Sequence, residues 1–244
     1  MRLRQRPLHW MTPMNPAPER VLANLREVRD RIADAARRSG RTPDAVRLVA
    51  VTKAVPTETI RLLLAAGQQD IGENRARQLR DRAAELADAH VRWHMIGRLQ
   101  RNKVKYVVPA AAMIHSVDSV RLAEEISKRA QAAGARATCL LEVSVSGEEA
   151  KGGLAPAEAP RLAAETAALP ALDLVGLMTM APLAETGETV RPVFAALREC
   201  LARVNRTADL PAALTELSMG MTQDYETAIE EGATIIRVGT ALFR

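Results

Sequence analysis

The stretch VRLVAVTKAVP, Val46 to Pro56, has the pattern of a complete β/α junction. A mostly apolar run predicts a buried strand, and PTETIRLLLAAG follows it as a helix with proline at its start and glycine at its end. Lys53 stands between the two. Because lysine is costly to bury, it usually marks the point where a strand reaches water. The alternative is a rim lysine whose amine performs covalent chemistry.

The same unit recurs along the chain from residue 46 to its end at residue 244. Helical patterns separate the apolar runs, and strands that are apolar on both faces indicate a parallel sheet wrapped by helices. Eight units predict an α/β fold, a single closed (β/α)8 TIM barrel. A doubly wound open sheet is the alternative, but no GxGxxG follows the first strand. The predicted strands are residues 46–52, 69–72, 92–97, 112–117, 137–145, 172–180, 215–220 and 234–239.

The N-terminal region lies outside this repeating pattern. An extra helix predicted at about residues 18–39 could supply the outer helix that the last strand lacks, because the chain stops at Arg244. The first 14 residues are rich in arginine, contain no acid and hold no hydrophobic core of a secretory signal. We expect residues 1–16 to form a disordered tail, or to precede a true start at Met11 or Met14, and residues 17–244 to form the barrel.

Composition narrows the class of protein. Charged residues are 26% and hydrophobic residues 48%, as in soluble globular proteins, and no apolar run suggests a membrane partner. The net charge of +5 is spread along helices, and with only 2% aromatic residues we expect no nucleic-acid partner. Cys139 and Cys200 lack metal-binding spacing, so we expect no metal, no disulfide and a reducing cytoplasm.

The strand ends indicate where a site would lie, since barrel active sites form at the C-terminal ends of the strands. Glycine and hydroxyl residues follow the last two strands in LSMG, ending at Gly220, and VGT, ending at Thr240. Barrels often bind phosphate there, although each motif alone could be a plain turn. A phosphate site together with the amine of Lys53 is the combination that pyridoxal phosphate requires.

Eight motifs in order resemble the YggS/PROSC family of pyridoxal phosphate-binding proteins, also called pyridoxal phosphate homeostasis proteins. The resemblance runs from about residue 20 to 243. The motifs are LVAVTK, IGENR, WHMIGRLQRNK, IHSVDS, KGG, GLMTM, LSMGMTQDYETAIEEG and RVGTALF.

The resemblance implies a barrel similar to the N-terminal domain of alanine racemase, with pyridoxal 5'-phosphate held as a Schiff base on Lys53. It also implies an arginine near the pyridine ring at Arg237, where a permanent cation would disfavour protonation of the ring nitrogen and weaken the ring as an electron sink. The remaining contacts that it implies are phosphate ligands at Ser218, Gly239 and Thr240, the asparagine of GEN at Asn74, and methionines beside the cofactor at Met178 and Met219.

Two functions follow from the resemblance. A carrier would buffer or deliver pyridoxal phosphate without substantial catalysis, with cofactor-dependent enzymes as acceptors, and we expect it to be a cytoplasmic monomer. A racemase would need proton donors on both faces of a substrate carbanion, and the only tyrosines are Tyr106 and Tyr225, to which we assign no role. A barrel that binds another phosphorylated metabolite, with Lys53 as an aldolase-type residue, is a third possibility.

Several residues stay open at this point. His94 and His115 lie in apolar strand patterns and are either acid/base groups or hydrogen-bonded structural residues. Lys151 could lie near the mouth of the barrel, at a second site for incoming cofactor. The basic segment 98–107 is either a docking surface or a solvated connector. The ending TALFR could leave the last strand frayed.

Overall fold

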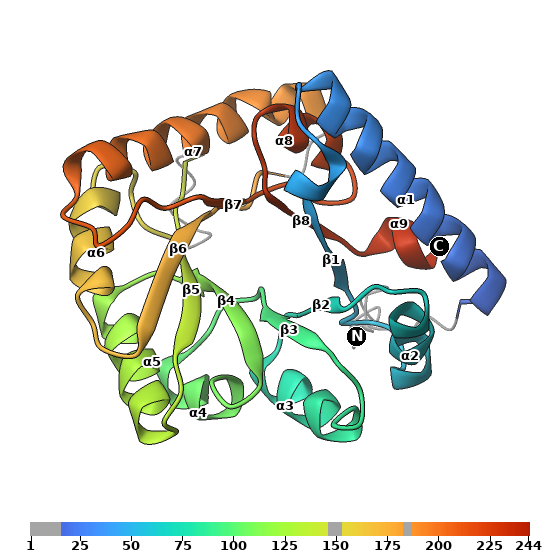
Figure 1. Cartoon of the computed structure of the whole chain (residues 1–244), viewed down its shortest axis with the longest axis horizontal. Helices are drawn as coiled ribbons and strands as arrows, with labels where there is room; N and C mark the ends of the chain where they lie inside the picture. The colour runs from blue at the N-terminus through green and yellow to red at the C-terminus, as the bar shows by residue number, and fades with distance from the viewer. Residues whose placement is uncertain (1–15, 146–152, 183–186) are drawn as a thin grey trace, which may run out of the picture.

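The computed structural model describes residues 16–145, 153–182 and 187–244. Its strands are parallel and close into a barrel in chain order, with β8 paired back to β1 (Figure 1). This closure confirms the barrel and excludes the open sheet. The strands are β1 (Arg47–Val51), β2 (Asp70–Glu73), β3 (Arg92–Met95), β4 (Ala111–Val117), β5 (Ala137–Glu142), β6 (Leu172–Met178), β7 (Glu216–Ser218) and β8 (Ile235–Val238).

Helices surround the barrel, and the segment after β3 has the least helical structure among them. There the chain forms only a short 3-10 turn, η3 (Arg101–Lys103), and α4 (Val104–Val107). A second such turn, η2 (Pro43–Ala45), precedes β1. The other helices are α1 (Pro18–Arg38), α2 (Thr57–Ala65), α3 (Ala76–Glu85), α5 (Val120–Ala132), α6 (Ala159–Ala167), α7 (Gly187–Thr207), α8 (Tyr225–Glu230) and α9 (Thr240–Phe243).

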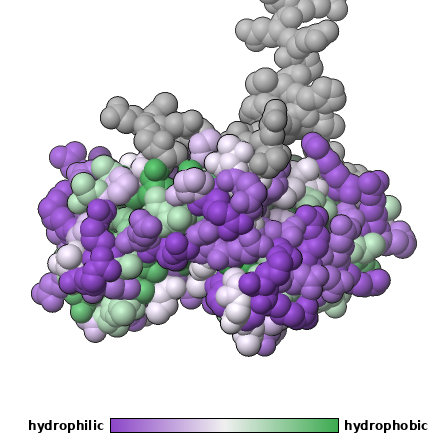
Figure 2. Space-filling view, turned by 90° about the horizontal axis from the view of Figure 1, so that it is seen from above, coloured by the Kyte–Doolittle hydropathy of each residue, from purple (hydrophilic) through white to green (hydrophobic). Residues whose placement is uncertain are grey.

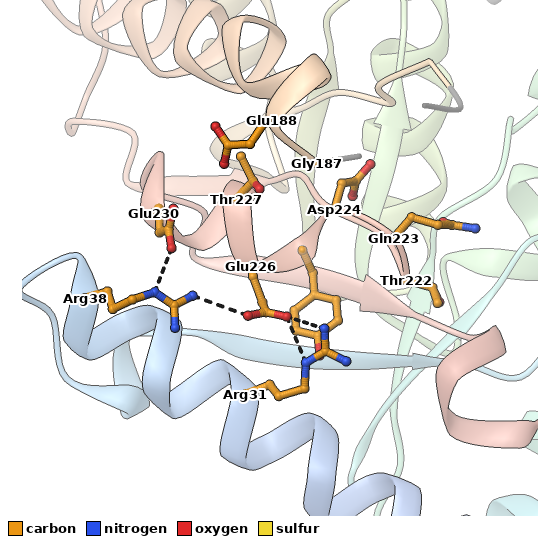
Figure 3. Close-up of a pocket in the computed structure, with 11 residues that line it drawn as sticks. Arg31, Arg38, Gly187, Glu188, Thr222, Gln223, Asp224, Glu226, Thr227 and Glu230 are labelled. Atoms are coloured by element: carbon orange, nitrogen blue, oxygen red, sulfur yellow. Dashed lines mark hydrogen bonds and ion pairs between the residues drawn. The ribbon is translucent and has the colours of Figure 1, made fainter. Parts of the chain in front are cut away.

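The N-terminal helix α1 takes the place of an outer helix next to β8. It runs along α8 and α9 in Figure 1, and its apolar face is fully buried, including Leu25 and Val28. Charged side chains at its rim contact α8: Arg38 donates to Glu230 at 2.9 Å, and Arg31 pairs with Glu226 (Figure 3). The predicted role of the extra helix is therefore confirmed.

Two apolar clusters result from the alternation of side chains along the strands. The larger cluster lies between the strands and the helices. The smaller one fills part of the barrel interior and consists of Val49, Met113, Leu140, Met178 and Ile235. Polar side chains occupy much of the remaining interior, and they form the site described below.

The surface is largely hydrophilic on the face that Figure 2 shows. Among the described residues, Met180 is the one large hydrophobic side chain that is clearly exposed, at 43%. In the same part of the chain, every helix is too short or too polar to span a membrane.

Candidate functional site

Three of the predicted site residues meet inside the C-terminal end of the barrel. Met178, the last residue of β6, pairs in register with Ser218, the last residue of β7. Arg237 on β8 reaches Ser218 and donates from Nη1 to its Oγ at 2.5 Å. Its Nη2 donates to the carbonyl oxygen of Thr179 at 2.9 Å. The guanidinium is thus fixed by two neighbouring strands.

Arg237 is a buried cation, with only 4% of its surface exposed. Burial lowers the pKa of Arg237 to about 10, and the carboxylates of Asp224 and Glu142 act against that shift. Because this pKa still lies far above neutrality, the side chain stays positively charged. The barrel interior therefore presents a fixed positive charge below its mouth.

Small residues follow β7 and β8, as the phosphate interpretation requires. Gly220 adopts a φ of +93°, and a Cβ there would come within 2.6 Å of the Cβ of Ala228. Gly239 passes so close to β1 that a Cβ would lie 3.3 Å from the carbonyl oxygen of Val51. Thr240 is half-buried and opens α9, and its hydroxyl has no hydrogen bond to another described residue. The backbone N–H of Gly239 donates to Oγ1 of Thr222 at 3.3 Å, so the hydroxyl of Thr240 is the unengaged side-chain donor at this edge.

Lys53 lies just beyond the end of β1, beside that edge, and its side chain is exposed. Its backbone is held in place: Gln78 donates to its carbonyl oxygen at 3.2 Å, and Arg82 donates to the carbonyl oxygen of Thr52 at 2.8 Å. Arg82 also pairs with the buried Glu73. The amine itself makes no contact of this kind with any described residue, so the lysine has a fixed base and a free end.

Asn74 follows β2, the strand next to β1. Its Oδ1 is buried and has no hydrogen-bond partner among the described residues. Gly97, after β3, permits this arrangement, because a Cβ there would lie 2.3 Å from the backbone oxygen of Asn74. A buried polar atom without a partner is uncommon in folded proteins and fits a position completed by a bound group.

The two predicted methionines face different directions. Met178 belongs to the cluster inside the barrel. Met219 is fully buried in the cluster between strands and helices. Only Met178 therefore lines the barrel interior, and a contact of Met219 with a cofactor stays a prediction.

A line of buried polar side chains runs from Ser218 toward the N-terminal end of the barrel. Ser218 Oγ lies 2.9 Å from Nδ1 of His115, and Nε2 of His115 lies 2.8 Å from Nδ1 of His94. Nε2 of His94 lies 2.9 Å from Oδ1 of Asp70, which opens β2. Both histidines are hydrogen-bonded residues of the interior. We name Asp70, His94, His115 and Ser218 the polar column.

Electrostatics differ along the polar column. Burial lowers the pKa of His94 and lowers that of His115 well below its usual value. Burial alone would raise the pKa of Asp70, but the hydrogen bonds from Arg92 and His94 outweigh it and hold that pKa well below its usual range. Our sequence analysis missed Asp70. The alternation in DIGEN, which places Asp70, Gly72 and Asn74 on one strand face, was the available signal.

The sequence singled out two further features. Lys151 falls outside the described residues. In the basic segment after β3, Arg98 and Arg101 are exposed, and Tyr106 packs beneath arginine and lysine side chains, with Arg80 4.8 Å from its ring centre. This segment lies on the outside of the barrel.

Comparison with known proteins agrees with this geometry. The family model for the N-terminal domain of alanine racemase matches residues 23–244. A pyridoxal phosphate homeostasis protein of Aquifex aeolicus is 44% identical over 219 residues, which are 90% of this chain and 95% of the relative. One from Pseudomonas aeruginosa is 40% identical over 223 residues, covering 91% and 94%.

A solved structure gives the same result. PipY of Synechococcus elongatus, solved with pyridoxal phosphate bound, superimposes with a TM-score of 0.81 at 36% identity, covering 92% of this chain and 100% of PipY. These matches agree in family and extend over almost the whole barrel. The chain belongs to the alanine racemase N-terminal domain family and, within it, to the YggS/PROSC family of pyridoxal phosphate homeostasis proteins.

Proposed function

We propose that this protein binds pyridoxal 5'-phosphate at the C-terminal mouth of its barrel and serves in homeostasis of the cofactor, by buffering or delivering it, without substantial catalysis. One observation carries the proposal. The buried cation Arg237 lies below an edge of small residues that adjoins β1, the strand that precedes Lys53. The cofactor bound in the relative PipY supports it.

The residues present fit the chemistry of the cofactor. The unpartnered Oδ1 of Asn74 and the free hydroxyl of Thr240 are polar groups without a use in the protein alone. In our proposal Gly239 and Thr240 hold the phosphate, Arg237 faces the pyridine nitrogen, and Met178 forms part of the wall. When bound, the cofactor supplies an aldehyde that condenses with the amine of Lys53, with loss of water, and a ring that can withdraw electrons.

Arg237 favours binding over catalysis. Its guanidinium stays charged at neutral pH, as its pKa of about 10 requires. A cation beside the pyridine nitrogen disfavours protonation of that nitrogen, and an unprotonated ring stabilises negative charge on a substrate poorly. The site would therefore hold the cofactor firmly and support little carbanion chemistry.

The positions of the two tyrosines also support a carrier over a racemase. Tyr225 lies in α8, is buried, and packs against Arg31 of α1 at 5.5 Å from its ring centre. Tyr106 lies in α4 on the outside of the barrel. Neither side chain is placed to serve as the second proton donor that racemisation needs.

The wider setting follows from the same proposal. Both cysteines are free and buried, which suits a reducing cytoplasm. Enzymes that require pyridoxal phosphate are the acceptors we propose for delivery. We further propose that residues 17–244 are the binding domain and act as a monomer.

Absorbance titration with pyridoxal phosphate tests the proposal. The wild type should develop the yellow band of a cofactor linked to an amine, and Lys53→Ala should not. Lys128→Ala, which removes an exposed lysine of α5, is the matched control and should keep the band. A colourless wild type would refute binding at Lys53, and a band retained in Lys53→Ala would move the attachment to another lysine. Isotope exchange at the α-carbon of alanine then measures any racemase activity.

A further inference from the structure

The geometry of the polar column determines the direction of its hydrogen bonds. We infer that its hydrogen bonds run in one direction, with the hydroxyl proton of Ser218 turned toward His115, so that Ser218 is an acceptor that positions Arg237 and not a donor to a phosphate. The part that concerns the cofactor rests on the function proposed above.

Asp70 is an ionised acceptor at the closed end of the column. Arg92 donates to both of its oxygens, from Nε to Oδ1 at 2.9 Å and from Nη2 to Oδ2 at 2.5 Å. A carboxylate in such a two-pronged pair can only accept. Because His94 Nε2 lies 2.9 Å from Oδ1, that nitrogen must carry a proton.

The two histidines transmit this direction. A neutral imidazole has one N–H and one acceptor nitrogen, so Nδ1 of His94 accepts from Nε2 of His115 at 2.8 Å. Nδ1 of His115 is then an acceptor as well. Neutral rings are expected here, because both side chains are buried and three arginines act against further positive charge: Arg47, Arg92 and Arg237.

Ser218 is the last member of the column and is left with lone pairs only. Its single hydroxyl proton goes to His115 at 2.9 Å, and one lone pair accepts from Nη1 of Arg237 at 2.5 Å. Phosphate oxygens are acceptors too, so they gain nothing from this hydroxyl. The hydroxyl of Thr240 is therefore the free side-chain donor toward a phosphate, since the N–H of Gly239 already donates to Oγ1 of Thr222 at 3.3 Å. Asp70, His94 and His115 are positioning residues for Arg237.

Imidazole ¹⁵N chemical shifts of the cofactor-free protein test the direction without any ligand. Substituting His9 and His90 leaves only the two histidines of the column. Both should be protonated at Nε2 and bare at Nδ1. A proton on Nδ1 of either ring, or a doubly protonated ring, would overturn the inference.

Removing the anchor gives a second test. In Asp70→Leu no carboxylate fixes the direction of the hydrogen bonds, so imidazole tautomers protonated at Nδ1 should appear in both histidines. Asp173→Leu is the control, since Asp173 of β6 forms a similar pair with Arg136, which precedes β5, away from the column. An Asp70→Leu protein that folds with unchanged tautomers would contradict the inference. If that variant does not fold, the wild-type shifts still decide.

The affinities for pyridoxal phosphate and for pyridoxal, which lacks the phosphate, distinguish a Ser218 that positions Arg237 from a Ser218 that donates to the phosphate. Ser218→Ala should weaken the binding of both by a similar factor, roughly tenfold, because the loss acts through Arg237. Thr240→Val should weaken pyridoxal phosphate far more than pyridoxal. A Ser218→Ala effect confined to pyridoxal phosphate, or no effect, would overturn the assignment. If the wild type binds neither compound, the proposed function fails, while the tautomers still test the column.

Discussion

Arg237 and Asp70 are the buried charges on which the barrel interior depends. Their exposed fractions are 4% and 6%. Each has polar partners: Arg237 donates to Ser218 and Thr179, and Asp70 accepts from Arg92 and His94. Removing one member of such a set leaves a desolvated charge, which typically destabilises by about 3–5 kcal/mol. Both residues are therefore expected to contribute to the stability of the barrel.

The polar column predicts a loss of stability on mild acidification. The pKa values of His94 and His115 are lowered by burial, so the unfolded chain takes up protons first as the pH falls through about 6.5. The stabilising effect is present above that pH and is lost below it, by up to about 1.4 kcal/mol per pH unit for each histidine. Urea unfolding of wild type and His115→Gln between pH 7 and 6 measures this. A wild-type free energy of unfolding that does not fall would contradict it.

At the level of residues, the place of a residue in the fold could be predicted best where its type and position alone indicate that place. Lys53 at a strand end and the glycines after β7 and β8 are such positions. Asp70 was missed because its role depends on Arg92 and His94, which are distant in the chain. The alternation in DIGEN indicates the strand face on which Asp70 lies, but no sequence period indicates the residues with which it pairs.

Helix α1 illustrates what determines a whole element. Its apolar spacing predicted residues 18–39, and the helix spans Pro18–Arg38. The prediction for strand β2 was shifted by one residue: residues 69–72 were predicted, and the strand spans Asp70–Glu73. The charged Glu73 can end a buried strand because Arg82 pairs with it and Thr52 donates to it at 2.5 Å. The apolar spacing that predicts a helix is local in the sequence, whereas the one-residue shift of β2 depends on the tertiary contacts of Glu73.

Packing of α1 should depend on apolar burial and not on its ion pairs. Leu25→Ala removes a fully buried side chain and should lower the free energy of unfolding by about 2–5 kcal/mol. Arg38→Gln breaks pairs in which the arginine is half-exposed and should cost less than about 1 kcal/mol. Urea denaturation of the two variants measures both. Equal losses would show that the ion pairs hold the helix.

The whole barrel accounts for the arrangement of the site. Closure brings β8 beside β1, and so places residues near the end of the chain next to the strand that precedes Lys53. Alternating units in the sequence were sufficient to predict this, because connection length and apolar strands leave few other topologies. The shortness of β7, which spans only Glu216–Ser218 of the predicted 215–220, could not be predicted in the same way.

Residues 1–16 should be dispensable for the folded barrel. The buried core of the described chain begins at Val21 in α1. A protein starting at residue 17 should keep its free energy of unfolding within about 0.5 kcal/mol and its affinity for pyridoxal phosphate. Sedimentation of both forms should give the mass of one chain. A large loss of stability would contradict the proposed domain limits. A dimer would contradict the proposed monomeric state.

The most direct test of the central claim is the position of covalent attachment. Protein loaded with pyridoxal phosphate is reduced with borohydride, and its peptides are analysed by mass spectrometry. The added mass should appear on Lys53 and on none of the other four lysines, Lys103, Lys105, Lys128 and Lys151. Attachment to another lysine, or no attachment at all, would contradict it.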